Sequence, residues 1–449
     1  MKICVLEYNL ISIFMRKPMK SSLFKCFLFV CSLSIFGLMA CDNGNEPEQP
    51  NNSEPHKVQV TKGTVLTDAM LPKLTVEGYD FIGWKLGNEF VFPGYEVKED
   101  CTLEAELGKQ LVINGKAYAN TSEVFVEGKT FTGTSNRDSD GNEINYEGSF
   151  PEGTSVTINS YRIGRFEVTQ ELYAAVMEGK KIWNYDEHGK IKYYDVVAEP
   201  SWCVEKYNQK FGLEDFGIQK YRPVEEVTWY DAILFCNTLS EKVGLTPAYN
   251  IEFIKITKWW KDDLTAGTDG FHIEDANVTL NEGADGYRLP YETEWEFAAR
   301  GANPNSKEWE YLFAGSPCGN VYDYNSEINT GLDGYGWYAC NNSTGSSSMS
   351  DKDVSWYYDN YCARAKEPNS WGTHQVGLLK PNSIGIFDMS GNVFEWCYDE
   401  KNDGDERAER GGGWFFGAAN SVVSNREISG QPGFRYNQVG IRLVRTCAE

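Results

Sequence analysis

Apolar positions follow two different periods along the chain. From residue 57 to residue 108, short β-rich runs alternate with Gly and Pro turns, a pattern typical of a small antiparallel sheet. Further on, three stretches have apolar residues at helical spacing. Their sequences are VTQELYAAVMEG (168–179), VTWYDAILFCNTLSEKVG (227–244) and ETEWEFAARG (292–301). The change of pattern near residue 108 predicts a small β-module followed by a larger mixed domain of about 340 residues.

Local capping signals support the three helices. Thr169 precedes the first helix, with Glu171 in its first turn. In the second, Thr228 and Asp231 match the capping pattern in which a hydroxyl and a carboxylate bind each other's backbone N–H groups. In the third, Trp295 and Ala299 are four residues apart and share one face.

Little regular structure is expected between these helices. The segments there are rich in Gly, Asn and Ser with scattered aromatic residues, and most of the 13 tryptophans lie downstream of residue 108. Ordering such backbone costs about 1–2 kcal/mol per residue. Aromatic burial, disulfides or a bound metal must therefore stabilise the loops.

The N-terminus has the layout of an export signal. A basic segment with Arg16, Lys17, Lys20 and Lys25 precedes the apolar run 26–40, which is short for a membrane span. The junction LMAC resembles the lipobox of bacterial lipoproteins, which makes Cys41 the predicted lipidated residue. An ordinary signal peptide with a chance cysteine at the junction is the alternative.

The predicted location follows from this signal. Residues 1–41 form the signal peptide, and residues 42–56, which lack aliphatic side chains, form a disordered tether. We expect an exported protein, lipid-anchored to the bacterial outer membrane on its periplasmic or surface side. The lipid anchor is its only predicted contact with the membrane.

Charge and cysteine content exclude several functions. The net charge of −23 becomes −27 once residues 1–41, with five basic groups and one acid, are removed. Such an acidic surface disfavours nucleic acid and anionic lipid but is compatible with divalent cations. Eight of the twelve cysteines lie beyond Cys41, none in CxxC spacing, and only four histidines occur, which disfavours zinc and iron sites. Some of these cysteines could pair in an oxidising compartment.

The β-module has its own resemblance. The run GYDFIGW, residues 78–84, followed by VKEDCTLEAEL resembles one Listeria-Bacteroides (internalin-type) repeat. That resemblance implies a small β-grasp-like module over residues 57–108 that serves as a spacer or adhesion unit. By the residues alone, Tyr79, Phe81 and Trp84 form the core of a small sheet.

Four ordered stretches carry a second resemblance. They are PVEEVTWYDAILFCN (223–237), YRLPYETEWEFAARGA (287–302), KPNSIGIFDMSGNVFEWCYD (380–399) and RGGGWFF…SNREISGQPGFRYNQVGIRLVR (410–445). Together they resemble the formylglycine-generating enzyme (sulfatase-modifying factor) family. The resemblance implies an α+β, C-type-lectin-like fold with little regular secondary structure over residues 109–449.

The resemblance also implies a calcium site. In the family, four residues of a GN turn bind calcium through carboxylate or amide side chains and main-chain carbonyls. The matching residues here are Asp388, Gly391, Val393 and Glu395. Calcium prefers six to eight oxygen ligands. Without the resemblance, Asp388 and Glu395 are interpreted as solvated hairpin carboxylates, because their spacing is not that of an EF-hand.

Copper chemistry is not expected. Copper-dependent oxidases of the family have two cysteines five apart, just beyond an Arg-Gly-Gly-Ser-Trp motif. The motif here is Arg410-Gly-Gly-Gly-Trp414, and no cysteine lies between Trp414 and Cys447. Soft thiolates are the ligands that Cu(I) prefers. Cys397 and Cys447 could replace them only if the fold joined them, so no catalytic residue is assigned.

The leading hypothesis is therefore a non-catalytic, calcium-stabilised module that binds a glycan or an envelope protein. Its candidate ligand-binding residues are aromatic, amide and guanidinium side chains near the C-terminus. They are Trp414, Phe415, Phe416, Asn425, Arg426, Phe434, Arg435 and Tyr436. Core packing is the alternative role for the aromatic residues. Two other functions stay open: a formylglycine-generating oxidase acting on sulfatase cysteines, and a structural subunit of an export or motility apparatus.

Overall fold

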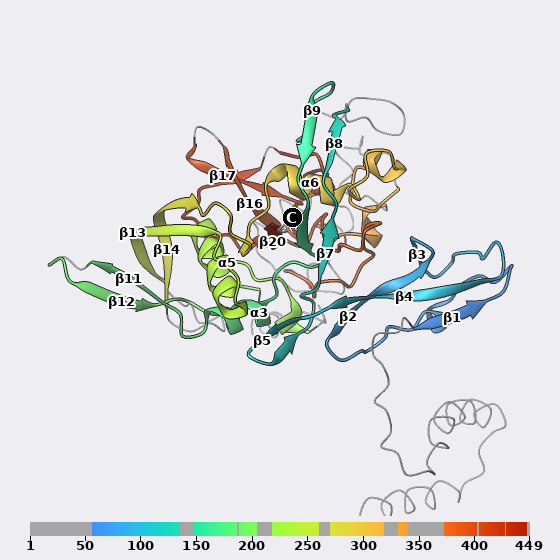
Figure 1. Ribbon diagram of the computed structural model, residues 1–449, viewed down its shortest axis with the longest axis horizontal. Helices are drawn as coiled ribbons and strands as arrows, with labels where there is room; N and C mark the ends of the chain where they lie inside the picture. Colours follow the sequence, from blue (N-terminus) through green and yellow to red (C-terminus); the bar gives the residue numbers. More distant parts are fainter. Residues whose placement is uncertain are drawn as a thin grey trace, which may run out of the picture. The chain divides into compact units, whose positions relative to one another are not determined.

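The computed structural model describes most of the chain beyond residue 55 (Figure 1). The described residues are 56–134, 148–185, 188–203, 218–259, 270–317, 331–339, 341, 372–401, 404–426 and 428–446. Cys41, the rest of the predicted signal peptide and residues 42–55 of the predicted tether lie outside them. Residues 55–449 form one compact unit.

The first sheet is a four-stranded antiparallel sheet in the order β1-β4-β2-β3. Its strands are β1 (Lys57–Val60), β2 (Tyr79–Leu86), β3 (Glu89–Val91) and β4 (Cys101–Lys109). Trp84 is buried in the core of this sheet, with Phe81 packed partly buried against it. Apart from the short 3-10 turn η1 (Asp68–Met70), no helix accompanies these strands in residues 56–109. The predicted small sheet is present, and its relation to a β-grasp repeat stays a prediction.

Asp80 connects this sheet to the chain that follows it. Its two carboxylate oxygens accept hydrogen bonds from the backbone N–H groups of Asn120, Thr121 and Ser122, at 2.7–2.9 Å. Close by, Arg165 donates to Glu106 of β4 at 2.8 Å. Charge-assisted bonds of this kind are stronger than neutral ones, so they fix the end of β4 against the larger domain.

Three α-helices occur in the described part of the larger domain, at the positions that the sequence predicted. They are α3 (Gln170–Met177), α5 (Trp229–Val243) and α6 (Glu292–Ala299). The Thr169 hydroxyl accepts from the backbone N–H of Leu172, and Thr228 and Asp231 form the predicted capping box. Figure 1 shows α3 and α5 side by side, and both bury apolar faces in the main core.

Short strands make up the rest of the domain. One sheet has the order β15-β20-β10-β7, formed by β15 (Tyr287–Arg288), β20 (Val444–Thr446), β10 (Tyr161–Gly164) and β7 (Glu123–Val126). Another has the order β18-β17-β16-β19, formed by β18 (Ser429–Gly430), β17 (Glu406–Arg410), β16 (Phe394–Lys401) and β19 (Val439–Gly440). Only the β16–β19 pair is parallel in these two sheets.

Four two-stranded hairpins complete the described strands. They are β5 (Leu111–Ile113) with β6 (Lys116–Tyr118), β8 (Lys129–Thr132) with β9 (Ser155–Ile158), β11 (Lys181–Tyr185) with β12 (Ile191–Asp195), and β13 (Tyr249–Trp259) with β14 (Gly270–Leu280). The predicted α+β class is confirmed. Aromatic side chains fill the core between these short elements, and Trp229, Trp295 and Trp396 are each 0–1% exposed.

Candidate functional site

The GN turn that the sequence singled out lies buried where β16 begins. Gly391 has φ of 108° and Asn392 has φ of 64°, so both residues turn the chain in the left-handed region. The Gly391 N–H donates to the Gly411 carbonyl and the Asn392 N–H donates to the Trp337 carbonyl, each at 2.7 Å. The turn is thus held by two segments that are distant in the sequence.

Glu395, just after the turn, forms a fully buried ion pair with Arg442. Both side chains are 0% exposed. Arg442 donates from Nε to both carboxylate oxygens at 2.9 Å and from Nη2 to Oε1 at 2.7 Å. Trp295 Nε1 donates to Oε2 at 2.6 Å. A carboxylate offers about four lone-pair positions, and these four bonds use all of them.

Glu167 is a further buried acid beside the turn. Its oxygens accept from the Asn392 side-chain amide at 2.6 Å and from the Val393 N–H at 3.2 Å. Burial, followed by the charges of Asp388 and Glu395, raises the pKa of Glu167 well above its usual range. The site is therefore a group of three buried carboxylates, Glu167 among them, around one guanidinium.

Asp388 is the predicted calcium ligand with free acceptor capacity. It is 2% exposed and has φ of 57°. Oδ2 accepts from the Gly377 N–H at 2.7 Å, whereas Oδ1 is buried without a hydrogen-bond partner among the described residues. Burial raises the pKa of Asp388 to about 6. The alternative of solvated hairpin carboxylates is wrong, because Asp388 and Glu395 are both buried.

The predicted calcium ligands fit an ion only in part. Asp388 Oδ1 is a buried oxygen that lacks a partner, which is a feature of a ligand position. Glu395 has no lone pair left beyond those used by Arg442 and Trp295. No group of three or more His, Cys, Asp or Glu side chains that could hold a metal occurs among the described residues. Calcium binding stays a prediction.

The candidate ligand-binding residues occupy different environments. Trp414 is 2% exposed, and its Nε1 donates to the Asn437 carbonyl at 2.9 Å. Phe415 and Phe416 pack edge-on against each other, and Phe416 also packs against buried Phe394. Trp414 therefore has the alternative role that the sequence left open, which is core packing.

Asn425 and Arg426 lie in a second environment. Asn425 is 4% exposed, and its amide donates to the Ala419 carbonyl at 3.4 Å. Arg426, with 39% of its side chain exposed, pairs with Glu292 at 2.9 Å. This pairing holds Arg426 over a buried charge network, so its guanidinium is committed to the fold.

The remaining candidates form a third group. Phe434 is 52% exposed and lies beside Tyr436 at a ring-centroid distance of 6.4 Å. Of the predicted aromatic residues, Phe434 is the one with a largely exposed ring. Arg435 forms an ion pair with Glu226 at 3.6 Å, whereas Arg426 pairs with a different acid. The two guanidiniums thus pair with acids that are far apart in the sequence.

A second buried charge network lies under Arg426. Arg410, 0% exposed, pairs with Glu292 at 3.1 Å and with Glu296 at 2.7 Å. Burial raises the pKa of Glu292, but Arg426 and Arg410 outweigh it and, with Lys401, lower that pKa to about 2. The network holds α6 against β17 and supplies no free acid or base.

The described cysteines are separate and unpaired. Cys101, Cys203, Cys236 and Cys397 are free, and the last three are buried. Burial raises the pKa of each of these three thiols, which disfavours the thiolate that copper requires. Cys397 contacts the Glu395 carbonyl, and Cys447 lies outside the described residues. No described pair of thiols replaces the two cysteines of the oxidases.

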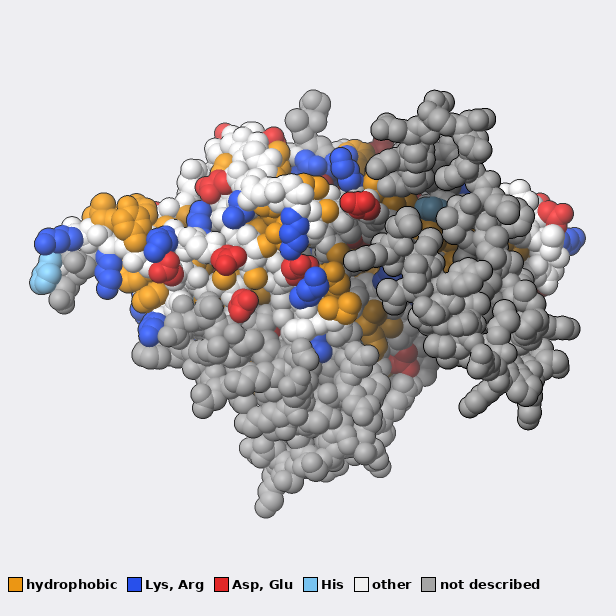
Figure 2. Space-filling view, turned by 90° about the horizontal axis from the view of Figure 1, so that it is seen from below, with side chains coloured by type: hydrophobic (Ala, Val, Ile, Leu, Met, Phe, Trp, Pro, Cys, Tyr) orange, Lys and Arg blue, Asp and Glu red, His pale blue; other side chains and the backbone are white. Residues whose placement is uncertain are grey.

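An exposed aromatic face, which the sequence pattern did not single out, occurs on the β11–β12 hairpin. Trp183 pairs with Tyr193 and Tyr185 pairs with Ile191 across the hairpin, so all four side chains point to one side. They are 44%, 64%, 59% and 55% exposed, respectively. Figure 2 shows hydrophobic and basic side chains gathered at the left of the view, where Figure 1 places this hairpin.

The opposite face of the hairpin is anchored in the domain. Ile182 is 1% exposed, and Tyr194 packs edge-on against Phe271 of β14 at 4.7 Å. The Asn184 amide donates to the carbonyl of Ile254, a half-exposed residue of β13. The hairpin is thus held by one side and presents apolar side chains on the other. The sequence signal that could have revealed this exposed face is the placement of large apolar residues at every second position on both sides of the turn.

Known proteins are similar to this chain in sequence. Residues 109–447 match the Sulfatase-modifying factor enzyme 1-like domain. The chain is 31% identical over 346 residues to a protein of Paenibacillus barcinonensis named Chaperone protein LppX, covering 74% of this chain and 92% of that protein. It is 29% identical over 114 residues to the formylglycine-generating enzyme of Thermomonospora curvata, covering 25% and 27% of the two chains.

A solved structure is also similar. Treponema denticola variable protein 1 shows 25% identity and a TM-score of 0.45, covering 75% of this chain and 98% of that one. The domain match covers residues 109–447, and the similarity to Chaperone protein LppX covers 92% of that protein, so both extend over most of the chain. The chain belongs to the sulfatase-modifying factor enzyme 1-like family. None of the helices in the described residues is long and apolar enough to span a membrane.

Proposed function

We propose that this protein is a non-catalytic, lipid-anchored member of its family that binds exported polypeptides through the β11–β12 hairpin. The observation that carries the proposal is the exposed face of Trp183, Tyr185, Ile191 and Tyr193. Contiguous apolar groups on a soluble surface mark interaction sites, because leaving them in water costs free energy. The partner is an extended, apolar-rich segment of an exported protein that has not finished folding.

The shape of the hairpin suits such a partner. Trp183 and Tyr185 pack edge-to-face at 5.7 Å, which orders both rings before any partner arrives. Ordered aromatic side chains lose little conformational entropy on binding. Because the face is a flat strand surface, it offers a row of contacts to a chain of any sequence rich in apolar residues. The similarity to a protein named as a chaperone supports this role.

Anchoring and location complete the proposal. Lipidation of Cys41 would fix the chain to the outer membrane on the periplasmic or surface side. Residues 42–56 would act as a flexible tether, and residues 57–108 as a spacer repeat. With this arrangement, the hairpin meets polypeptides that have just crossed the inner membrane or are reaching the surface. Glycans are the other class of ligand that the sequence suggested.

Removing the apolar face should abolish polypeptide binding. Replacing Trp183, Tyr185, Ile191 and Tyr193 by threonine keeps the strand propensity of the hairpin. We expect the affinity for an unfolded, aromatic-rich secretory protein to fall by about tenfold or more, because anchor residues dominate such interfaces. Fluorescence anisotropy measures this affinity, and light scattering measures the suppression of aggregation.

The control changes exposed apolar residues elsewhere. Phe125 and Leu378 are 49% and 44% exposed, and their replacement by threonine should leave binding unchanged. Both variants should melt close to the wild-type temperature, since all the changed side chains are largely in water. Wild-type affinity in the hairpin variant would reject this function.

The oxidase alternative has a direct chemical readout. Incubation with copper and a Cys-x-Pro-x-Arg peptide should leave the peptide mass unchanged, because no described pair of thiols can hold Cu(I). The formylglycine-generating enzyme of the same family, run in parallel, supplies the positive control. A mass change to the aldehyde in this chain would establish catalysis and overturn the non-catalytic assignment.

We also propose calcium stabilisation centred on Asp388, with the Gly391 and Val393 carbonyls as further ligands. Glu395, the fourth predicted ligand, would have to release a bond to Arg442 or Trp295 to join them. The partnerless Asp388 Oδ1 supports this proposal. At calcium about 100 times its Kd, binding adds about 2.7 kcal/mol to the free energy of unfolding. A chelator should therefore lower the Tm of the wild type but not that of Asp388→Asn. An unchanged wild-type Tm after chelation would count against the site.

A further inference from the structure

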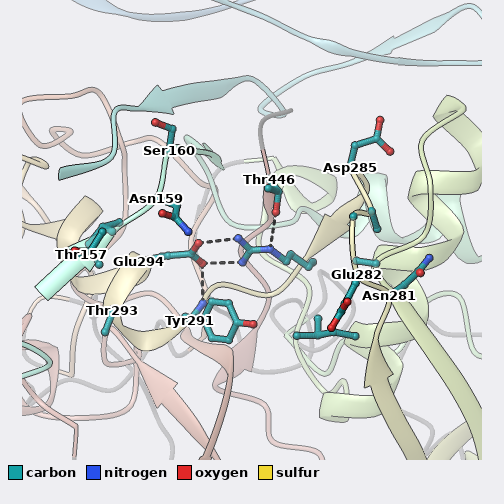
Figure 3. Close-up of a pocket in the computed structure, with 16 residues that line it drawn as sticks. Thr157, Asn159, Ser160, Asn281, Glu282, Asp285, Tyr291, Thr293, Glu294 and Thr446 are labelled. Carbon is teal, nitrogen blue, oxygen red and sulfur yellow. Dashed lines mark hydrogen bonds and ion pairs between the residues drawn. The ribbon is translucent and has the colours of Figure 1, made fainter. Parts of the chain in front are cut away.

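A cleft that has both polar and apolar groups in its lining lies away from both the GN turn and the aromatic hairpin. It has a volume of about 480 Å³ and is lined by residues from five parts of the chain: 157–160, Ala248, 280–285, 288–294 and Thr446. This volume lies within the range of small-molecule sites in proteins. Figure 3 shows Asn159, Tyr291 and Glu294 on one side of the cleft, with Asn281, Glu282 and Asp285 on the other.

The floor of the cleft is a rigid ion pair. Arg288 and Glu294 are both buried and form two parallel bonds of 2.7 Å. Arg288 Nε donates to the Thr446 hydroxyl at 3.4 Å and Nη1 also donates to the Leu289 carbonyl at 3.2 Å. Glu294 accepts the Tyr291 N–H at 3.0 Å. A guanidinium has five N–H donors, and one on Nη2 has no acceptor among the described residues.

The walls carry further hydrogen-bonding groups with spare capacity. Asn159 is exposed and presents its side-chain amide to the cleft, and the backbone bond to Glu294 holds Tyr291 in place beside Arg288. An amide donates and accepts, and so does a hydroxyl. The cleft therefore presents groups that can both donate and accept hydrogen bonds, close to one N–H of Arg288 that is available to a ligand.

Charge narrows the class of ligand. Arg288 and Glu294 neutralise each other, which leaves Glu282 and Asp285 as the net charge of the lining, −2. Backbone N–H donation from Thr246 lowers the pKa of Asp285, so it stays ionised at neutral pH. Two unpaired carboxylates repel phosphates, carboxylates and sulfates.

We propose that this cleft binds a neutral, polyhydroxylated ligand, namely one or two sugar units of an uncharged glycan. Vicinal hydroxyls both donate and accept, which matches amide, hydroxyl and carboxylate groups held around one guanidinium N–H. The half-buried Tyr291 ring adds an apolar surface for the C–H face of a sugar. This site is independent of polypeptide binding at the hairpin.

The test uses the purified full chain and defined disaccharides. Ligand-observed NMR and calorimetry are run with maltose, cellobiose, lactose and diacetylchitobiose, and with a glucuronic-acid disaccharide as the anionic counterpart. At least one neutral sugar should bind, and the anionic one should bind more weakly. Asn159→Ala and Tyr291→Phe should each weaken the neutral sugar about five- to tenfold, the effect of one lost hydrogen bond.

Matched variants show whether the sugar binds in this cleft or elsewhere on the protein. Asn305→Ala removes an exposed amide outside the cleft and should not change the affinity. Glu282→Gln with Asp285→Asn should raise the affinity for the anionic sugar towards that of its neutral counterpart. The hairpin variant, which tests polypeptide binding, should bind sugar like wild type. Failure of every neutral sugar to bind, or binding that Asn159→Ala and Tyr291→Phe leave unchanged, would overturn the proposal.

Discussion

Replacing Arg442 by leucine should destabilise the protein by about 3–5 kcal/mol, the cost of leaving a buried charge without its partner. Glu395 would lose three of its four hydrogen bonds, and Glu167 and Asp388 would lose a guanidinium whose charge favours their ionised forms. The Gly164 and Phe387 carbonyls would lose donors as well. Urea unfolding followed by tryptophan fluorescence measures the loss.

The control for this variant lies three residues further along. Arg445 pairs with Glu123 at 3.0 Å, but the two side chains are 26% and 15% exposed. Replacing Arg445 by leucine should cost less than replacing Arg442, because water still reaches part of both side chains of this pair. Equal losses in the two variants would mean that the buried position of Arg442 does not decide the effect.

Replacing Gly391 by alanine should cost about 2–5 kcal/mol, from two separate causes. Its φ of 108° is a conformation that L-residues other than glycine rarely adopt. A Cβ there would also lie 2.3 Å from the Trp337 carbonyl oxygen, so the backbone around Trp337 would have to move. The free energy of unfolding again measures the effect.

Alanine variants of two other glycines separate the cost of the backbone conformation from the cost of the steric contact with Trp337. Gly283 has φ of 78° with no atom within 4 Å of an added Cβ, so Gly283→Ala should show only the conformational cost, about 1–2 kcal/mol. Gly417, with φ of −66° and the same open space, should accept alanine without loss. A Gly391→Ala variant no less stable than Gly283→Ala would show that the turn can move away from Trp337.

Local signals explain which parts of the fold could be predicted. The three helices have caps and apolar faces within a few residues, so Thr169 and the Thr228–Asp231 box were readable from the sequence. The small N-terminal sheet was predictable for the same reason, since its turns are marked by Gly and Pro. Each of these features depends on residues close together in the chain.

The site depended on contacts that no local pattern encodes. Glu395 meets Arg442 across 47 positions, and Glu167 meets Asn392 across 225. A sequence shows carboxylates near a turn but does not show that a guanidinium from a distant segment binds one of them. The ion pairs of Arg426 and Arg435 could not be predicted for the same reason, because each joins residues that are far apart in the sequence.

The three buried free thiols can report on local unfolding of the domain, because each becomes reactive only when the structure around it opens. Cys203 lies beyond β12, Cys236 lies within α5 and Cys397 lies within β16, so they sample three different parts of the domain. An alkylating reagent reaches such a side chain only while its surroundings are open, at a rate set by the local opening free energy. The order in which these three sulfurs react would therefore rank the loosest and the most tightly held regions, without any added probe.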